Sequence, residues 1–475
     1  MRKSIPASLL LVITLSGCAT LKENTNDTTV SLPSYFIKET DTTLEASSLK
    51  AFLDDTALHR LVDTALANNF DLLAAVQRVE MLRANTRVTD AARFPQVNAM
   101  AGVAVDRYGK YTLDGVGNFD TNLSPNIDKN QRIPDPATDF FIGFRSSWEI
   151  DIWGKLKDRS KAAYSRFLAG AKGRQWLATQ ITAEVGRLYY ELLSLDQQLK
   201  IIQRNIELQK RGLEVVEAQM AGGRATALAV RQFRAQLLHT KETEIRTRQS
   251  ITRAESDLNI LLGRFSSPIS RDTTIMIKPV PVRIAGGVPS TLLLNRPDIQ
   301  QAELELLATK ADISAARKAF LPSLTLNPYV GFNAFKAPLL FNGASLAAGV
   351  ASGLAAPVFN RGALKAGLSI ANAEQATAYY HYQQKILEGF QEIVTELKAM
   401  DNLKEAYALK SEQVQTLKDA VATANDLYLA GYATYLEVIM AQAGVLQAEM
   451  EQVNMRKELL QTGINLYRSL GGGRL

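Results

Sequence analysis

The sequence predicts a mainly α-helical protein with a membrane β-barrel portion, in which a helix, two strands and a long coiled-coil hairpin occur twice in tandem. Three observations predict this fold: an internal repeat, two long stretches without proline, and four segments that alternate between apolar and polar residues. The fifteen prolines all lie outside residues 137–267 and 358–475. A proline inside a helix removes a hydrogen bond and clashes with the preceding turn, so each stretch is expected to hold a long helical hairpin.

The internal repeat keeps one register over more than a hundred residues. Its matched pairs are Gly154 and Gly362, Gly223 and Gly431, Thr226 and Thr434, Leu228 and Leu436, and Gly263 and Gly471. The expected organisation is a first repeat at 56–263 (strands 95–107 and 139–150, hairpin 155–262), a linker at the middle of the helical barrel at 264–290, and a second repeat at 291–473 (strands 322–333 and 345–358, hairpin 363–470).

The N-terminus has the pattern of a secretory signal peptide. Arg2 and Lys3 precede a short apolar run, and Leu-Ser-Gly-Cys at 15–18 matches a bacterial lipobox, which predicts removal of residues 1–17 and a lipid such as palmitate on Cys18. Cys18 is the only cysteine, so no intrachain disulfide can form. In lipoproteins generally, Ala at position 19 implies transport to the outer membrane. Residues 18–55, rich in Thr, Ser and Asn, are expected to form the lipidated tether.

The alternating segments have the length of membrane-spanning strands. In residues 140–150 the even positions are mostly apolar, whereas the odd positions include Arg145 and Glu149. A tilted strand of about ten residues spans a membrane, although a half-buried soluble sheet shows the same alternation. Backbone groups in lipid must be paired, and closing a barrel takes about eight strands, so four strands per chain require several chains to share one barrel. Because a charge facing lipid is costly, Arg145 and Glu149 are predicted to face the barrel lumen.

The hairpins show coiled-coil spacing and unequal arms. As helices, residues 158–220 would extend about 95 Å, whereas the return arm 225–262 would extend about 57 Å. The short helix predicted at 72–92 would supply about 32 Å, close to the missing length. We therefore predict that this short helix stacks end to end on the return arm, and the second copy has the same proportions.

Composition argues against other classes of protein. The formal net charge is +6 over 475 residues, without a basic run, which does not indicate nucleic-acid binding. The three histidines lie far apart in helical patterns, and neither a GxSxG nor a P-loop motif is present. We therefore expect no enzyme, no cofactor other than the covalent lipid, and no metal site.

Several motifs resemble the outer-membrane efflux protein family, which is TolC-like, and in particular its lipoprotein branch, the channels of resistance-nodulation-division efflux systems. They are the lipobox, SWEIDIWG at 147–154, RPD at 296–298, FLP at 320–322 and YLAGYATYLEVIMAQ at 428–442. The resemblance implies a homotrimer that shares one twelve-stranded outer-membrane barrel and continues as a periplasmic α-barrel. It also implies a passive exit duct for drugs, toxic compounds or metal ions, driven by an inner-membrane pump through a periplasmic adaptor.

The resemblance also assigns roles to residues of the two hairpin turns. The turns are expected to be periplasmic tips that dock the adaptor, through Gly222, Gly223, Arg224, Thr226, Gly431, Tyr432 and Thr434; the alternative is that the glycines only end helices. The usual family motif after the second tip resembles YLDVLDAQ. Here Glu437 stands at the first acidic position and Met440 at the second, where the family places a carboxylate ring at the closed periplasmic aperture, so the resemblance does not carry over such a ring. Asp426, Glu437 and Met440 are the aperture candidates; the alternative is that Asp426 and Glu437 are simply solvated.

The segment 107–138 is expected to be the main extracellular loop, and Trp148, Trp153, Tyr108 and Phe341 are candidates for interfacial girdles or ordinary packing. Two alternative functions remain at this stage: a protein-secretion channel of the same architecture, and a periplasmic structural lipoprotein whose coiled coils only bind partners. The sequence does not identify the exported substrate, because a wide duct selects little and specificity would reside in the pump.

Overall fold

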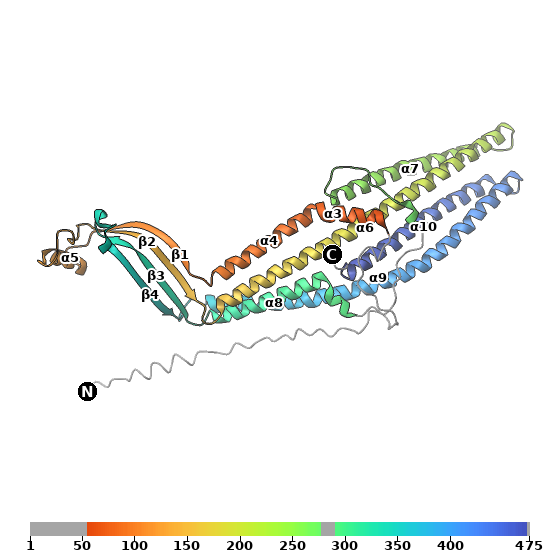
Figure 1. Cartoon of the computed structure of the whole chain (residues 1–475). Coiled ribbons are helices and arrows are strands. Elements are labelled where there is room, and N and C mark those ends of the chain that lie inside the picture. The colour runs from red at the N-terminus through yellow and green to blue at the C-terminus, as the bar shows by residue number, and fades with distance from the viewer. Residues whose placement is uncertain (1–54, 277–289, 473–475) are drawn as a thin grey trace. The chain divides into compact units, whose positions relative to one another are not determined.

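A computed structural model describes residues 55–276 and 290–472 (Figure 1). The predicted signal peptide and the lipidation site Cys18 lie outside the described residues, as does the tether apart from Asp55. No helix among the described residues is long and apolar enough to cross a membrane.

The described elements confirm the tandem arrangement predicted from the repeat. The first copy comprises α3 (Thr56–Asn68), α4 (Phe70–Ala91), β1 (Gln96–Asp106), α5 (Leu113–Leu123), β2 (Ala137–Ile150), α6 (Lys155–Ala221) and α7 (Ala227–Leu261). The second comprises the 3-10 turn η2 (Ser290–Asn295), α8 (Pro297–Lys318), β3 (Ser323–Ala334), the 3-10 turns η3 (Ala337–Leu339) and η4 (Gly343–Ser345), β4 (Leu346–Ala355), α9 (Ala363–Leu429) and α10 (Tyr435–Ser469). The outgoing arms α6 and α9 have 67 residues each and the return arms α7 and α10 have 35 each, so the two hairpins match in length.

Two expectations on local structure need correction. The strand expected at 345–358 ends at Ala355, two residues before Pro357, which has no N–H to donate to a strand ladder. The long loop after β1 also contains a helix, α5, which its Asp, Asn and Gly content did not indicate.

The main hydrophobic core lies on α6, where the long arm passes α3, the end of α7 and α10. Tyr189, Tyr190, Leu192 and Leu193 of α6 are almost fully buried there. From the expected linker, Ile275 and Met276 of the 3-10 turn η1 (Thr273–Met276) join the same core. Residues 277–289 of the linker lie outside the described part of the chain.

The predicted stacking of the short helix on the return arm is confirmed. Asn69, which caps the start of α4, donates from Nδ2 to the carbonyl oxygen of Leu261, the last residue of α7, at 3.0 Å. Gly263 follows with φ +64, and a Cβ there would lie 2.3 Å from the carbonyl oxygen of Asn68. The close approach of the two helix ends therefore requires glycine.

The four strands form one antiparallel sheet in the order β1-β2-β3-β4. Residues that lie directly opposite one another share a face, and the register brings the apolar residues of all four strands onto one face. The apolar residues of this face are Val97, Ala99, Ala101, Val103, Val105, Phe140, Ile142, Phe144, Trp148, Ile150, Leu324, Leu326, Pro328, Val330, Phe332, Ala334, Leu346, Ala348, Val350 and Leu354. The β2–β3 ladder is interrupted opposite Asn327 and Pro328, since proline cannot donate a hydrogen bond.

Candidate functional site

The apolar face of the sheet is open rather than covered by helices. Val97, Phe144, Val350 and Leu354 are all more than half exposed, with Val350 at 71%. A continuous exposed apolar face of this kind is unusual for a protein surrounded by water and is expected of a surface in contact with lipid. β1 and β4 are also edge strands, so their outer backbone groups have no partner within the described sheet.

The predicted lumen residues lie on the opposite face. Arg145 is opposite Asn98 on β1 and Tyr329 on β3, and its guanidinium lies 4.6 Å from the ring centroid of Phe141. Glu149 lies on the same face and forms an ion pair of 2.6 Å with Lys155, the first residue of α6. The charged side chains of β2 are therefore separated from the apolar face, as the alternation predicted.

Two tryptophans connect the sheet to the helical segments. Trp148 donates from Nε1 to the carbonyl oxygen of Arg93 after α4, at 2.9 Å, and Trp153 donates to the carbonyl oxygen of Pro322 after α8, at 2.7 Å. Both bonds lie at the helical end of the sheet, so they fix where strands and helices meet.

The first hairpin turn is a compact helix end followed by a capped helix start. Gly222 caps α6, and Gly223 has φ +72, a conformation that glycine adopts without strain. Arg224 donates its backbone N–H to the carbonyl oxygen of Gln219 at 2.8 Å. Thr226 caps α7 by accepting from the backbone N–H of Ala229 at 3.2 Å.

The second turn repeats this geometry. Gly431 has φ +82, and Tyr432 donates its backbone N–H to the carbonyl oxygen of Leu427 at 2.8 Å while its side chain is 85% exposed. Thr434 and Glu437 form a capping box, with the Thr434 N–H 2.6 Å from Glu437 Oε2. The structure thus gives Glu437 a local structural role in addition to its candidacy at the aperture.

The other aperture candidates are exposed near the same turn. Asp426 lies in the last turn of α9, and Met440, at 66% exposure, lies in the second turn of α10. The two turns are joined by a small cluster in which Val216, Phe233 and Val438 are buried, and Tyr428 donates its hydroxyl hydrogen to Gln219 Oε1. Sequence reasoning did not identify this connection, because its members are far apart in the chain.

A buried charge on α10 also escaped the sequence analysis. Glu449, almost fully buried, accepts from Arg204 of α6 at 2.6 Å and pairs with Lys418 of α9 at 3.0 Å. One carboxylate therefore joins the two hairpins part of the way along the coil. The sequence signal that could have indicated this buried charge is a glutamate at a core position of the heptad pattern.

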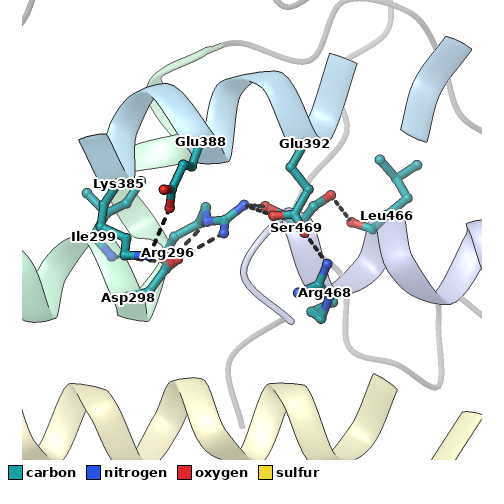
Figure 2. A network of polar contacts seen from close by, with 9 residues as sticks. All are labelled: Arg296, Asp298, Ile299, Lys385, Glu388, Glu392, Leu466, Arg468 and Ser469. Carbon is teal, nitrogen blue, oxygen red and sulfur yellow. Dashed lines mark hydrogen bonds and ion pairs between the residues drawn. The ribbon is translucent and has the colours of Figure 1, made fainter. Parts of the chain in front are cut away.

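A second polar network surrounds Arg296, which is 3% exposed (Figure 2). Its guanidinium donates to Asp298 at 2.9 Å, to Glu392 of α9 at 2.9 Å and to the carbonyl oxygen of Ser469 at the end of α10 at 2.8 Å. Arg468 pairs with the other oxygen of Glu392. The network therefore joins α8, α9 and α10 at the place where α8 begins.

A cavity of about 680 Å³ lies beside this network, lined by residues of α6, α8, α9 and α10 that include Trp176, Glu305 and Glu396. Burial raises the pKa of both carboxyl groups. No group of three or more His, Cys, Asp or Glu side chains within residues 55–276 and 290–472 is arranged to hold a metal ion.

An amphipathic sheet with open edges, joined to two long helical hairpins, defines a class of protein: an outer-membrane channel with a helical extension into the periplasm. The chain belongs to the outer membrane efflux protein family, whose model matches residues 61–264 and 288–472. It functions as an outer-membrane efflux duct.

Curated relatives match almost the whole chain. The chain is 27% identical over 472 residues to the probable outer membrane lipoprotein SilC of Salmonella typhimurium, covering 98% of each chain. It is 31% identical to the pyoverdine export outer membrane protein OpmQ of Pseudomonas putida, over 88% of this chain and 86% of that one. It is 28% identical to the cation efflux system protein CusC of Escherichia coli K12, over 89% of this chain and 88% of that one.

Solved structures of outer-membrane channels have the same fold as this chain. A crystal structure of CusC aligns with a TM-score of 0.81 at 26% identity, over 93% of this chain and 97% of that chain. The outer-membrane channel OprN aligns with a TM-score of 0.80 at 25% identity, over 92% of this chain and 94% of that chain. These relatives are channel proteins rather than enzymes, and they favour the efflux channel over the protein-secretion channel and the structural lipoprotein.

Proposed function

We propose that three copies of this chain close one twelve-stranded barrel and serve as the outer-membrane duct of a tripartite efflux system. The observation that carries this proposal is the four-stranded sheet with one exposed apolar face and two free edges. In lipid the edge backbone groups must be paired, so β1 of one copy is expected to pair with β4 of the next. Four strands are too few to close a barrel, and three copies supply twelve.

Apolar side chains on the hairpins support the same assembly. Ile245 and Ile260 on α7 and Leu387 and Leu409 on α9 are each more than 60% exposed. Large apolar side chains exposed along a long helix are expected to pack against a partner, and these four stay uncovered within the described chain. In the proposed trimer, α7 of one copy meets α9 of its neighbour, so that the helices continue the barrel.

The two hairpin turns are proposed to dock a periplasmic adaptor that connects the duct to an inner-membrane resistance-nodulation-division pump. The matching geometry of the turns and the 85% exposed ring of Tyr432 support this role. A large exposed aromatic ring at a rigid turn is the type of residue that anchors protein interfaces. Lipidation of Cys18 would attach each copy to the outer membrane in addition to its barrel strands.

The exported substrate is proposed to be set by the pump. The relatives include a cation efflux protein, a pyoverdine export protein and a toluene efflux pump protein, which are named for chemically different substrates. An open duct that serves such different substrates can select little. We therefore propose a broad class of exported substrates for this chain, namely small molecules and metal ions.

Purification from outer membranes, followed by mass determination with light scattering, tests the assembly. A trimer with a bound detergent belt is expected, and a monomer that is soluble after removal of the lipid anchor would contradict the proposal. For docking, Tyr432→Ala is expected to weaken adaptor binding while the trimer remains intact. Tyr380→Ala, on an exposed position of α9 far along the chain from the turn, is the control for adaptor binding.

A further inference from the structure

The loop between β1 and β2 carries a helix whose apolar side has no cover. In α5, Leu113, Val116, Phe119 and Leu123 follow helical spacing on one side and are 89%, 56%, 69% and 67% exposed. Exposure of apolar side chains to water is unfavourable, so four of them on one side of a short helix indicate a surface that is buried in the assembly.

α5 is nevertheless held firmly by its polar side. The Thr112 hydroxyl caps the helix by accepting from the Gly115 N–H at 3.1 Å. The Asn122 side chain binds both backbone groups of Ile133, each at 2.9 Å. Lys336 from the β3–β4 turn donates to the carbonyl oxygens of Lys129 and Asn130 at 2.8 and 3.0 Å. These bonds fix the loop in a conformation that leaves the apolar side outward.

The strand register shows what lies near α5 in a closed barrel. Asp106 pairs with Ala137, Phe140 with Ala334 and Phe332 with Leu346, so the end of β1 and the start of β4 lie at the same end of the sheet. When β1 pairs with the neighbour's β4, the end of β1 comes next to the neighbour's β3–β4 turn, about 4.8 Å away. Within one chain, two strands separate β1 from β4, which amounts to about 14 Å.

That turn offers an apolar partner. Phe341 is 72% exposed, although one edge of its ring contacts Phe332 with the centroids 6.0 Å apart. Residues 107–112 connect β1 to α5 and can span about 20 Å, which brings both the chain's own β3–β4 turn and the neighbour's within reach. Within one copy the apolar side of α5 and Phe341 do not cover each other, since both stay exposed although Lys336 ties the loop to its own turn.

We propose that α5 is an inter-subunit clasp, in which its apolar side packs on Phe341 of the neighbouring copy at the extracellular end of the barrel. The proposal rests on the trimeric barrel of the proposed function. The clasp covers the apolar residues of α5 and reinforces each seam of the β-barrel, where the edge strands of two chains pair. Its partner is thus a second copy of this chain.

Disulfide crosslinking tests the clasp. Val116→Cys and Gly343→Cys are placed on separate, differently tagged chains that are expressed together, so that a bond between them must join two copies. A Cβ at Gly343 meets nothing within 4 Å, which makes this position tolerant, and Cys18 is the only native cysteine. We expect most of the mixed protein to run as a dimer that carries both tags on a non-reducing gel.

The control replaces Val116→Cys with Thr121→Cys, an exposed position on the opposite side of α5, and is expected to lose most of the crosslink. A bond that forms only when both cysteines are in one chain would place α5 on its own turn and overturn the clasp. The clasp would also be overturned if no crosslink forms in protein that light scattering shows to be trimeric. If the protein is not trimeric, the barrel proposal itself fails.

Discussion

Asn69 and Arg296 hold equivalent positions in the two repeats, and each donates a hydrogen bond across a junction between two stacked helices. Asn69 reaches the carbonyl oxygen of Leu261 at 3.0 Å, and Arg296 reaches that of Ser469 at 2.8 Å. Both acceptors are the last residue of a return arm. The same junction is therefore neutral in the first repeat and charged in the second.

The charged junction is expected to be the more sensitive of the two. Arg296→Met leaves the Asp298 carboxylate without its buried cation, while Glu392 keeps Arg468, and breaking a buried ion pair costs about 3–5 kcal/mol. Asn69→Leu removes two neutral hydrogen bonds, the one to Leu261 and the cap that accepts from the Leu72 N–H, and is expected to cost about 1–3 kcal/mol. Thermal unfolding of the purified protein checks the order, and equal small shifts would show that the network around Arg296 contributes little.

Val350 and Ala351 are adjacent in β4 and lie on opposite faces of the sheet. Val350→Arg places a cation on the apolar face, which costs about 2–4 kcal/mol in the middle of a membrane and should sharply reduce assembled protein in the outer membrane. Ala351→Arg places the same charge on the polar face and is expected to assemble normally. Gel analysis of heat-resistant oligomers measures both; equal assembly of the two variants would argue against a lipid-facing surface.

The second hairpin turn depends on its glycine. Gly431→Val forces a β-branched residue to φ +82 and is expected to destabilise the turn by about 1–2 kcal/mol, with weaker adaptor binding and lower export. The control Gly367→Ala replaces a glycine of α9 that lies far along the chain from the turn and has open space around its Cβ, and it should have little effect on either. Drug or metal susceptibility of cells that express each variant provides the export readout. Normal export with Gly431→Val would show that this turn is not needed.

The Asp55 carboxyl gives a pH-dependent prediction. Burial raises its pKa above the ordinary value of 3.8, although the N–H groups of Ala57 and Leu58 donate to it. Below that value the group is protonated whether the chain is folded or unfolded, and as the pH rises the folded state must ionise a buried group, so stability falls. Asp55→Asn keeps the helix cap, and we expect higher stability than the native chain at about pH 7 but no difference at about pH 3. Melting curves of both proteins at the two pH values test this. An increase in melting temperature that is equal at the two pH values would show that ionisation of Asp55 is not its cause.

Replacing the buried Gln209 of α6 with an apolar residue is expected to raise the stability of the fold. Both polar atoms of the Gln209 side chain are buried and have no hydrogen-bond partner within the described structure. An unsatisfied buried polar group costs about 1–3 kcal/mol, so Gln209→Met, of similar shape, is expected to raise the melting temperature. Gln175→Met, at an exposed position of the same helix, serves as the control and is expected to leave the melting temperature unchanged. A lower melting temperature for Gln209→Met would reveal a partner, such as a buried water.

The sequence predicted the features that depend on periodicity. The alternation in 140–150 identified the faces of β2, and the spacing of apolar residues identified α6 and α9 to within a few residues. Helix lengths predicted the stacking at Asn69. These signals are local or repeat along the chain, so a single sequence contains them.

The features that were missed depend on tertiary contacts. Nothing near Arg296 in the chain indicates that it binds the end of α10, 173 residues away. The helix α5 was missed because its glycines and asparagines favour a loop, whereas the bonds from Asn122 to Ile133 hold the helix in place. The pairing of Glu449 with Arg204 and Lys418 likewise requires three helices that the sequence does not place together.

The stacked junctions also constrain the order of folding. Each hairpin joins segments that follow one another along the chain, and such local contacts form quickly because little loop entropy is lost. The junction at Asn69 instead connects residues 192 positions apart. We therefore expect the hairpins to form first and the junctions to close late, so that a chain interrupted before α7 would leave α4 without the helix end on which it rests.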